Sequence, residues 1–301
     1  MRPEIEQAVK LLERGDNQAL EEALALLQNT VFSFSMRVCG QREDAEDTMQ
    51  ETLSKLVPHF PKFESRFESP KALLVWLYKV AKNRCLMSRR RSKFAPKQEL
   101  SLEELMPDRK EMERLSAGGT INPEMFAIRS EEAKRLRAAI QKLPPQYRIV
   151  LVLRDMEGLT DEEVAEISGL RPGTVRVRLH RARLFVRKEV MKARRSPRDR
   201  SVNAVASRVG ATSRHAPARC KAMFAELSDY LDERLDDSLC EELEMHLNGC
   251  EPCKVFLASL QATIEGCRTS PAEGLDRKKA GDLRRKVLTD YEEMVARNVS
   301  G

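Results

Sequence analysis

The stretch that decides the fold is EGLTDEEVAEISGLRPGTVRVRLHRARLFVRK, residues 157–188. Thr160 and Glu163 have the T-x-x-E spacing of a capping box, in which each residue satisfies an N–H of the other at a helix start. Gly169 supplies a turn, and Pro172 suits the first position of a second helix, where its missing N–H costs nothing. The stretch therefore predicts a helix-turn-helix.

The second helix of this motif is apolar on one side and cationic on the other. Its apolar side carries Val175, Leu179, Ala182 and Val186. Largely off that side are Thr174, Arg176, Arg178, Arg181, Arg183 and Lys188. All of them except Lys188, together with Arg171 just before the helix, are predicted to bind DNA. Such a helix packs on one face and enters a DNA major groove with the other. A solvated basic face is the alternative, but the capping box, glycine and proline beside it favour DNA binding.

Composition places the chain in the all-α class. Of its 301 residues only 5% are aromatic, and strand-like runs are few. No stretch approaches ~20 uninterrupted apolar residues, so no membrane span is expected. Residues 171–200 hold twelve Lys/Arg and two Asp/Glu, a net +10, whereas residues 224–245 hold one Arg and nine Asp/Glu, a net −8. The first segment suits a polyanion and the second could mimic one.

Helical periodicity and its interruptions divide the chain into six parts. Residues 1–91 and 124–192 have helical patterns, and a Pro- and Gly-containing linker, 92–123, separates them. A basic segment rich in small residues, 193–219, is expected to be a flexible linker. A short acidic helical module, 220–270, and a C-terminal amphipathic helix, 271–301, complete the chain.

The acidic module carries a metal-binding pattern, Cys220-x25-His246-x3-Cys250-x2-Cys253. Three thiolates and one imidazole are a typical ligand set for tetrahedral Zn2+. Asn248 and Gly249 provide a turn between the histidine and the last two cysteines. The alternative is that these are four unrelated residues of a packed bundle.

The other four cysteines are expected to lie outside the metal site. Cys240 would lie about 240° around the helix from His246, and Cys267 would lie ~21 Å from Cys253 along an unbroken helix. Cys39 and Cys85 are expected to be packed thiols. Metal thiolates and an odd cysteine count suit a reducing cytoplasm better than a disulfide scaffold.

The order of motifs resembles the extracytoplasmic-function (ECF) sigma factors of bacterial RNA polymerase. REDAEDTMQETLSKL, residues 42–56, is similar to their conserved region 2, and WLYKVAKNRCLMSRRR, 76–91, resembles their −10-reading helix. Residues 143–183, from LPPQYRIV to LHRAR, resemble region 4, which reads the −35 element. Many family members have aspartate where Met87 stands and serine where Val177 stands, and the linker is longer here than usual.

The resemblance implies a non-enzymatic cytoplasmic factor that binds core RNA polymerase and promoter DNA. The implied polymerase-binding residues, which otherwise would be a solvated charged face, are Glu43, Asp44, Glu46, Asp47 and Glu51. The implied −10 contacts are Arg66, Lys79, Asn83, Arg84, Arg89, Arg90 and Arg91. The loop KFESRFES, 62–69, matches the family's base-capturing loop, although Phe63 and Phe67 could instead be core residues, and Trp76 is expected in the core.

The acidic module resembles the zinc-binding anti-sigma domain, which is usually a separate inhibitor protein. The chain thus resembles a sigma factor fused to its own regulator, with metal or oxidation setting when the module releases the sigma part. A module that assists promoter binding is a second possibility. A third is a helix-turn-helix regulator that acts without polymerase and carries a structural zinc module.

Overall fold

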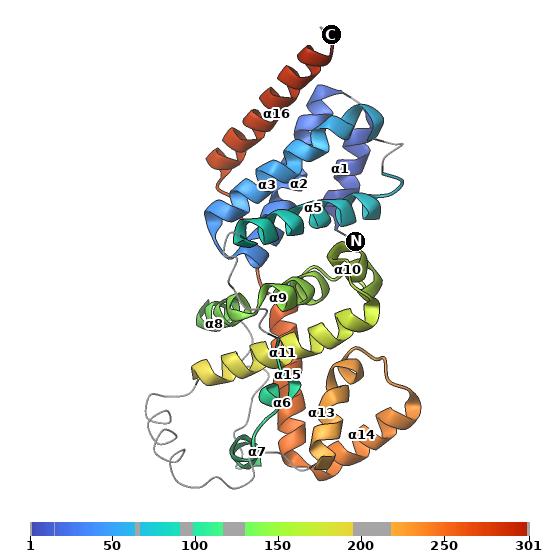
Figure 1. Ribbon diagram of the computed structural model, residues 1–301, viewed down its shortest axis with the longest axis vertical. Helices are drawn as coiled ribbons and strands as arrows, with labels where there is room; N and C mark the ends of the chain where they lie inside the picture. The colour runs from blue at the N-terminus through green and yellow to red at the C-terminus, as the bar shows by residue number, and fades with distance from the viewer. Residues whose placement is uncertain are drawn as a thin grey trace. The chain divides into compact units, whose positions relative to one another are not determined.

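The computed structural model describes residues 2–14, 16–63, 67–90, 99–116, 130–194 and 218–299. Within these ranges every regular element is helical, which confirms the all-α prediction (Figure 1). None of the helices in the described ranges combines the length and apolarity needed to cross a bilayer. The chain divides into two compact units, residues 1–96 with 159–172 and 271–301, and residues 97–158 with 173–270.

The first unit is built around the helices α1 (Pro3–Arg14), α2 (Asn17–Cys39), α3 (Arg42–Leu56) and α5 (Pro70–Arg90). Asp16 begins α2 because its carboxylate accepts the Ala19 N–H at 2.7 Å. Gly40 ends α2 in the left-handed conformation (φ 77°), which lets the chain turn directly into α3. The rings of Phe34 and Tyr78 stack at 4.5 Å in the core between α2 and α5.

A disulfide joins α2 to α5 in this core. Cys39 and Cys85 are each 1% exposed, as expected for packed residues, but their sulfur atoms are bonded and their Cα atoms lie 5.5 Å apart. The prediction of two free thiols is therefore corrected. The sequence could not show the pairing because the residues are 46 positions apart and meet only when α2 and α5 pack together.

Aromatic residues in and beside the predicted base-capturing loop, 62–69, pack against one another. Phe63 and Phe67 are buried with ring centroids 5.1 Å apart, so the core alternative describes their placement. Trp76 is partly buried and contacts Phe67 and His59 edge-on. Residues 64–66, including Arg66, lie outside the described residues.

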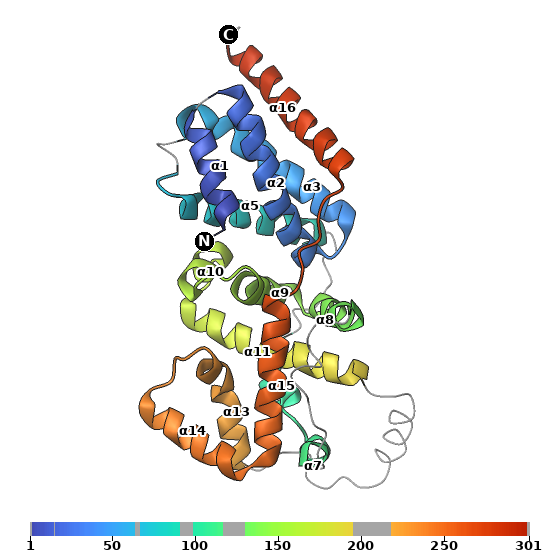
Figure 2. The same ribbon diagram turned by 180° about the vertical axis from the view of Figure 1, so that it is seen from behind.

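Two more helices pack on α5, α2 and α3 within the first unit. The short helix α10 (Asp161–Ser168) lies on α5, where Lys71 pairs with Glu163 at 3.0 Å and Lys82 donates to the Ile167 carbonyl at 2.8 Å. The C-terminal helix α16 (Arg277–Val299) runs beside α3 and α2, as both opposite views show (Figure 2). Val287 and Ala280 of α16 are buried, so the helix is packed by its apolar side.

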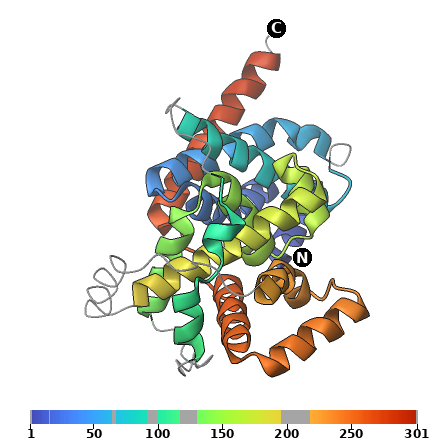
Figure 3. The ribbon, with the colours of Figure 1, turned by 60° about the horizontal axis from the view of Figure 1, so that its bottom comes forward.

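The second unit holds three groups of helices. Its first part is α6 (Leu102–Leu105), α7 (Arg109–Ser116), α8 (Ser130–Lys142), α9 (Pro145–Leu151) and the π-helical turn η3 (Val152–Met156). The long helix α11 (Pro172–Arg194) follows, with Pro172 belonging to the first unit. The helices α13 (Ala218–Leu231) and α15 (Glu251–Arg268) contact α11, and α14 (Asp237–Gly249) packs on α15 (Figure 3).

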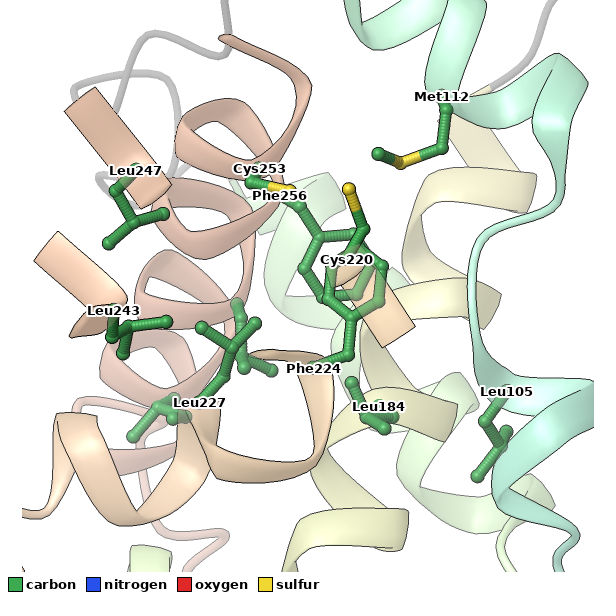
Figure 4. Close-up of a cluster of buried hydrophobic side chains, with 12 residues drawn as sticks. Leu105, Met112, Leu184, Cys220, Phe224, Leu227, Leu243, Leu247, Cys253 and Phe256 are labelled. Atoms are coloured by element: carbon green, nitrogen blue, oxygen red, sulfur yellow. The ribbon is translucent and has the colours of Figure 1, made fainter. Parts of the chain in front are cut away.

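One hydrophobic core joins these three groups. Leu184 of α11 is buried in the same cluster as Phe224 of α13 and Phe256 of α15 (Figure 4). Leu105 and Met112, from the region predicted as a linker, are buried there as well. The acidic module and part of that region therefore share a core with α11, instead of standing apart from it. Residues 195–217, in the predicted basic linker, are outside the described residues.

Candidate functional site

The start of the helix-turn-helix is as predicted. Glu163 N donates to the Thr160 hydroxyl at 3.3 Å, and Thr160 N donates to the Glu163 carboxylate at 2.6 Å, which completes the capping box. Gly169 ends α10 in the left-handed conformation (φ 71°), where other residues would be strained. These local contacts bring the chain to Pro172, where α11 begins.

The predicted DNA-binding residues of α11 differ in accessibility along the helix. Arg171, just before the helix, and Thr174 and Arg176 in its first turns are exposed, and Arg178 and Arg181 are half-buried. Arg183, in contrast, has no exposed surface. Leu184, Val186 and Arg187, which follow it, are also buried. In this conformation Arg183 is not available to DNA, whereas the cations near the start of α11 and Lys188 near its end remain exposed.

Two carboxylates hold Arg183. Its Nε and Nη2 donate to Asp155 of η3 at 2.8 and 2.6 Å, and its Nη1 and Nη2 donate to Asp232, just after α13, at 2.9 and 3.0 Å. Burial disfavours the charged guanidinium, but these bonds and the two negative charges outweigh it and raise the pKa of Arg183. Burial also opposes ionisation of Asp232, yet Arg183 lowers the pKa of that carboxyl.

Arg187, one turn further along α11, contacts two other helices, α15 and α7. Its guanidinium lies 3.6 Å from the centroid of the Phe256 ring, a cation–π contact with α15. Its Nε donates to the Ser259 hydroxyl at 2.5 Å, and Nη1 pairs with Glu111 of α7 at 3.2 Å. Arg187 was not predicted as a site residue, because on sequence alone it belongs to a long run of similar cations.

His180 of α11 packs against the acidic module. Its Nδ1 lies 2.7 Å from the Ser228 hydroxyl of α13, and its Nε2 is buried with no hydrogen-bond partner in the described structure. Burial, followed by the positive charges of Arg183 and Arg181, lowers the pKa of His180 to about 4. The ring is therefore neutral at physiological pH.

The four predicted metal ligands come together. Cys220 lies in α13, His246 near the end of α14, Cys250 between α14 and α15, and their donor atoms with that of Cys253 all lie within 4.8 Å of one another. His246 Nε2 is 3.3 Å from Cys253 Sγ and 3.7 Å from Cys220 Sγ. Ligand atoms around a tetrahedral zinc ion are about 3.3–3.8 Å apart, given bonds of about 2.0–2.3 Å.

The chemistry of this cluster fits a cation. Burial is the main cause that raises the pKa values of Cys220 and Cys253, and Cys250 raises both further. The thiols of Cys220 and Cys253 therefore keep their protons unless a cation displaces them, and a bound Zn2+ would do so while cross-linking the three helices. Cys240 and Cys267 are outside the cluster, in agreement with the sequence prediction.

The metal cluster is next to the aromatic pair of the shared core. Cys220 and Phe224 are one turn apart on α13, and Cys253 and Phe256 are three residues apart on α15. The two rings lie 4.6 Å from each other, directly beyond the cysteines (Figure 4). A continuous path of contacts thus runs from two metal ligands through Phe224 and Phe256 to Arg187 of α11.

The predicted polymerase-binding carboxylates lie along α3. Glu43 and Asp47 are exposed, and Asp44 and Glu51 are partly so. Glu46 is only 6% exposed, because Arg42 pairs with it at 3.0 Å and Lys279 of α16 also pairs with it. A second cation of α16, Arg284, pairs with Glu21 of α2 at 3.4 Å. The sequence indicated neither contact of α16.

The predicted −10 residues are only partly described. Lys79 and Asn83 are exposed four residues apart on α5, so they share one side of the helix. Arg84 is half-buried, and its Nε pairs with Glu51 at 2.7 Å, which links the predicted DNA side to the acidic helix. The side chains of Arg89 and Arg90, and the whole of Arg91, lie outside the described residues.

Family models match three parts of the chain. "Sigma-70 region 2" matches residues 24–94, "Sigma-70, region 4" matches 133–186, and a model described as "Putative zinc-finger" matches 220–254. These ranges contain, respectively, the acidic helix with α5, most of the helix-turn-helix, and all four candidate metal ligands.

Curated relatives agree with the first two models. An RNA polymerase sigma-H factor of Pseudomonas aeruginosa is 30% identical over 59% of this chain and 89% of its own length. The ECF RNA polymerase sigma factor SigW of Bacillus subtilis is 26% identical over 62% of this chain and 96% of its own. SigE of Mycolicibacterium smegmatis, also an ECF sigma factor, is 32% identical, and the match covers 58% of this chain and 63% of SigE.

The helices and motifs thus define a transcription initiation factor with a zinc-finger-like module. The chain belongs to the ECF sigma factors of the sigma-70 family.

Proposed function

We propose that the chain directs core RNA polymerase to promoters by reading −10 and −35 elements, and that its zinc module restrains the −35-reading helix in cis. The observation that carries the second part is the buried contact of Asp232 with Arg183. Through this contact, an acidic side chain of the module pairs with a cation of the predicted DNA-binding helix, which would otherwise be free to bind a phosphate or a base edge.

Two further groups of contacts support this restraint. His180 and Arg187 of α11 are also engaged by the module, through Ser228, Ser259 and Phe256. In the first unit, α16 follows the module along the chain and pairs with Glu46, one of the predicted polymerase-binding carboxylates. The regions after residue 217 therefore contact both the predicted DNA-binding helix α11 and the predicted polymerase-binding helix α3 of the sigma part.

Zinc bound by Cys220, His246, Cys250 and Cys253 would hold α13, α14 and α15 in the arrangement that presents these side chains. A structural zinc of this kind contributes about 10–16 kcal/mol of apparent binding free energy, so its loss or the oxidation of its ligands would loosen so small a module. Metal analysis of the chain purified under reducing conditions tests the first step. Absence of a thiophilic metal would remove the proposed site.

Promoter-dependent transcription with purified core polymerase tests the function. Asp232→Asn removes the module's charge from Arg183 with little change in shape, and we expect it to raise transcription above that of the wild type. Asp237→Asn, at an exposed position of α14, is the matched control and should change nothing.

The double variant Cys250→Ser with Cys253→Ser tests the role of the metal. Higher transcription supports restraint, whereas lower transcription means that the module assists the sigma part. Activity equal to the wild type in a chain that does bind metal makes the module a docking or structural element. Sequence-specific DNA binding without any transcription by core polymerase would identify a regulator that acts independently of polymerase.

A further inference from the structure

Val177 is an unusual residue on the surface of α11. It is 51% exposed, one of the few large apolar side chains so placed in the described residues. Packing does not account for a valine at this position, because about half of its surface remains in contact with water. Helix propensity does not account for it either, because a β-branched side chain is less favourable in a helix than most polar alternatives.

The surroundings of Val177 are those of a DNA-reading surface. Thr174 lies three residues before it and Arg181 four residues after it, on the same side of the helix, and Arg178 is adjacent. Arg171, Thr174 and Arg176 near the start of α11 are all exposed. In helix-turn-helix proteins the N-terminal residues of the second helix are those that contact base edges.

An apolar group on such a surface has one specific partner in the major groove. The C5-methyl group of thymine is the apolar feature that a base pair presents there, and it distinguishes T·A from the other pairs. The arginines flanking Val177 would bind phosphates or guanine edges. The valine has no polar group, so its partner in the groove would be an apolar one.

We propose that Val177 is a specificity-determining residue that contacts a thymine methyl group in the −35 element. The proposal rests on the proposed function, since it requires α11 to enter promoter DNA. It adds a preference for thymine at one position, read by apolar contact rather than by a hydrogen bond.

Replacement of thymine by uracil tests this contact, because uracil lacks only the methyl group. Holoenzyme is assembled from core polymerase and the full chain carrying Asp232→Asn, and its −35 sequence is selected from random duplexes. Each thymine of that element is then replaced by uracil in turn, and affinities are measured. We expect one replacement to weaken binding about fourfold, the equivalent of one buried methyl group at ~0.8 kcal/mol.

Val177→Ser, added to the same chain, should bind the thymine and uracil duplexes equally. Leu239→Ser removes another exposed apolar side chain, on α14, and should leave the fourfold ratio unchanged. The inference is overturned if no thymine replacement matters, if the selected element has no thymine, or if the ratio persists in Val177→Ser. If no sequence is selected at all, the proposed function itself fails, and this inference with it.

Discussion

Arg183 pairs with two carboxylates inside the second unit, and all three side chains are buried. Its charge and its position in the arginine series predict contact with DNA, but Asp155 and Asp232 bury it completely. Neither carboxylate is near it in sequence. The placement depends on tertiary packing within the second unit, which no local pattern encodes.

Substitution of Arg183 and of Arg176 should have different effects on stability, because Arg183 is buried and Arg176 is exposed. Arg183→Ala leaves two buried carboxylates without their common partner, so we expect a loss of about 3–5 kcal/mol of stability in urea unfolding. Arg176→Ala is a change on the surface and should alter stability by less than about 0.5 kcal/mol. In promoter binding Arg176→Ala should cost ~1–3 kcal/mol if Arg176 reads a base edge. Equal effects of the two variants on stability would contradict the buried ion pair.

The burial of His180 predicts a dependence of stability on pH. Its pKa is lowered from 6.5 to about 4, so between these values the unfolded chain binds a proton that the folded chain does not. Stability therefore falls as the pH is lowered through this window, by on the order of 3 kcal/mol in total. His180→Asn should flatten the slope between pH 6.5 and 4, measured by urea unfolding with metal removed from both proteins. An unchanged slope would mean that another group causes it.

At the scale of helices, α15 connects the metal cluster to α11 through Phe256. Phe256→Leu keeps an apolar side chain but removes the ring that packs at an angle against Phe224 and lies under the guanidinium of Arg187. We expect the variant to bind the same amount of zinc as the wild type, while its transcription no longer responds to a chelator. Leu257→Met, at the next and partly buried position, is the control. A variant that still responds fully to the chelator would show that the coupling follows another route.

The contacts of α16 predict a second, separate effect on polymerase binding. Lys279→Glu with Arg284→Glu reverses two cations that pair with Glu46 and Glu21, so α16 should leave α3 and core polymerase should bind more tightly. Arg285→Glu is the control, because Arg285 is exposed and pairs within its own helix with Asp282. Unchanged or weaker binding of core polymerase by the double variant would show that α16 does not compete for this surface.

Across the whole molecule, the sequence predicted what depends on local pattern or on fixed spacing. The capping box, the turn at Gly169 and the convergence of Cys220, His246 and Cys250 were predicted in this way. Contacts between distant segments were not, because they depend on which helices pack together. Examples are the Cys39–Cys85 disulfide and the burial of Met112 with Phe256. The net −8 segment indicated that the module could meet cations, but not that Asp232 would meet Arg183.

The two units should respond to different chemical treatments. The four metal ligands all belong to the second unit, whereas the disulfide closes a segment of the first. In amide hydrogen exchange, a chelator should increase exchange in α13, α14 and α15 and leave α2 unchanged. Reduction of the disulfide should increase exchange in α2 and α5, since a cross-link over 46 residues stabilises by ~4 kcal/mol in the chain-entropy model. Increased exchange throughout the chain in both cases would contradict this independence.

The covalent connection between α11 and the helices that cover it has a consequence for dosage. A separate inhibitor acts according to its ratio to its target, so unequal synthesis of two proteins shifts the point at which activity begins. Here Asp232 and Arg183 are made in the same chain, and their ratio is one in every molecule. Under the proposed regulation, the active fraction would depend on the state of the metal site alone. Greater expression would raise the output in proportion, without moving the threshold of the response.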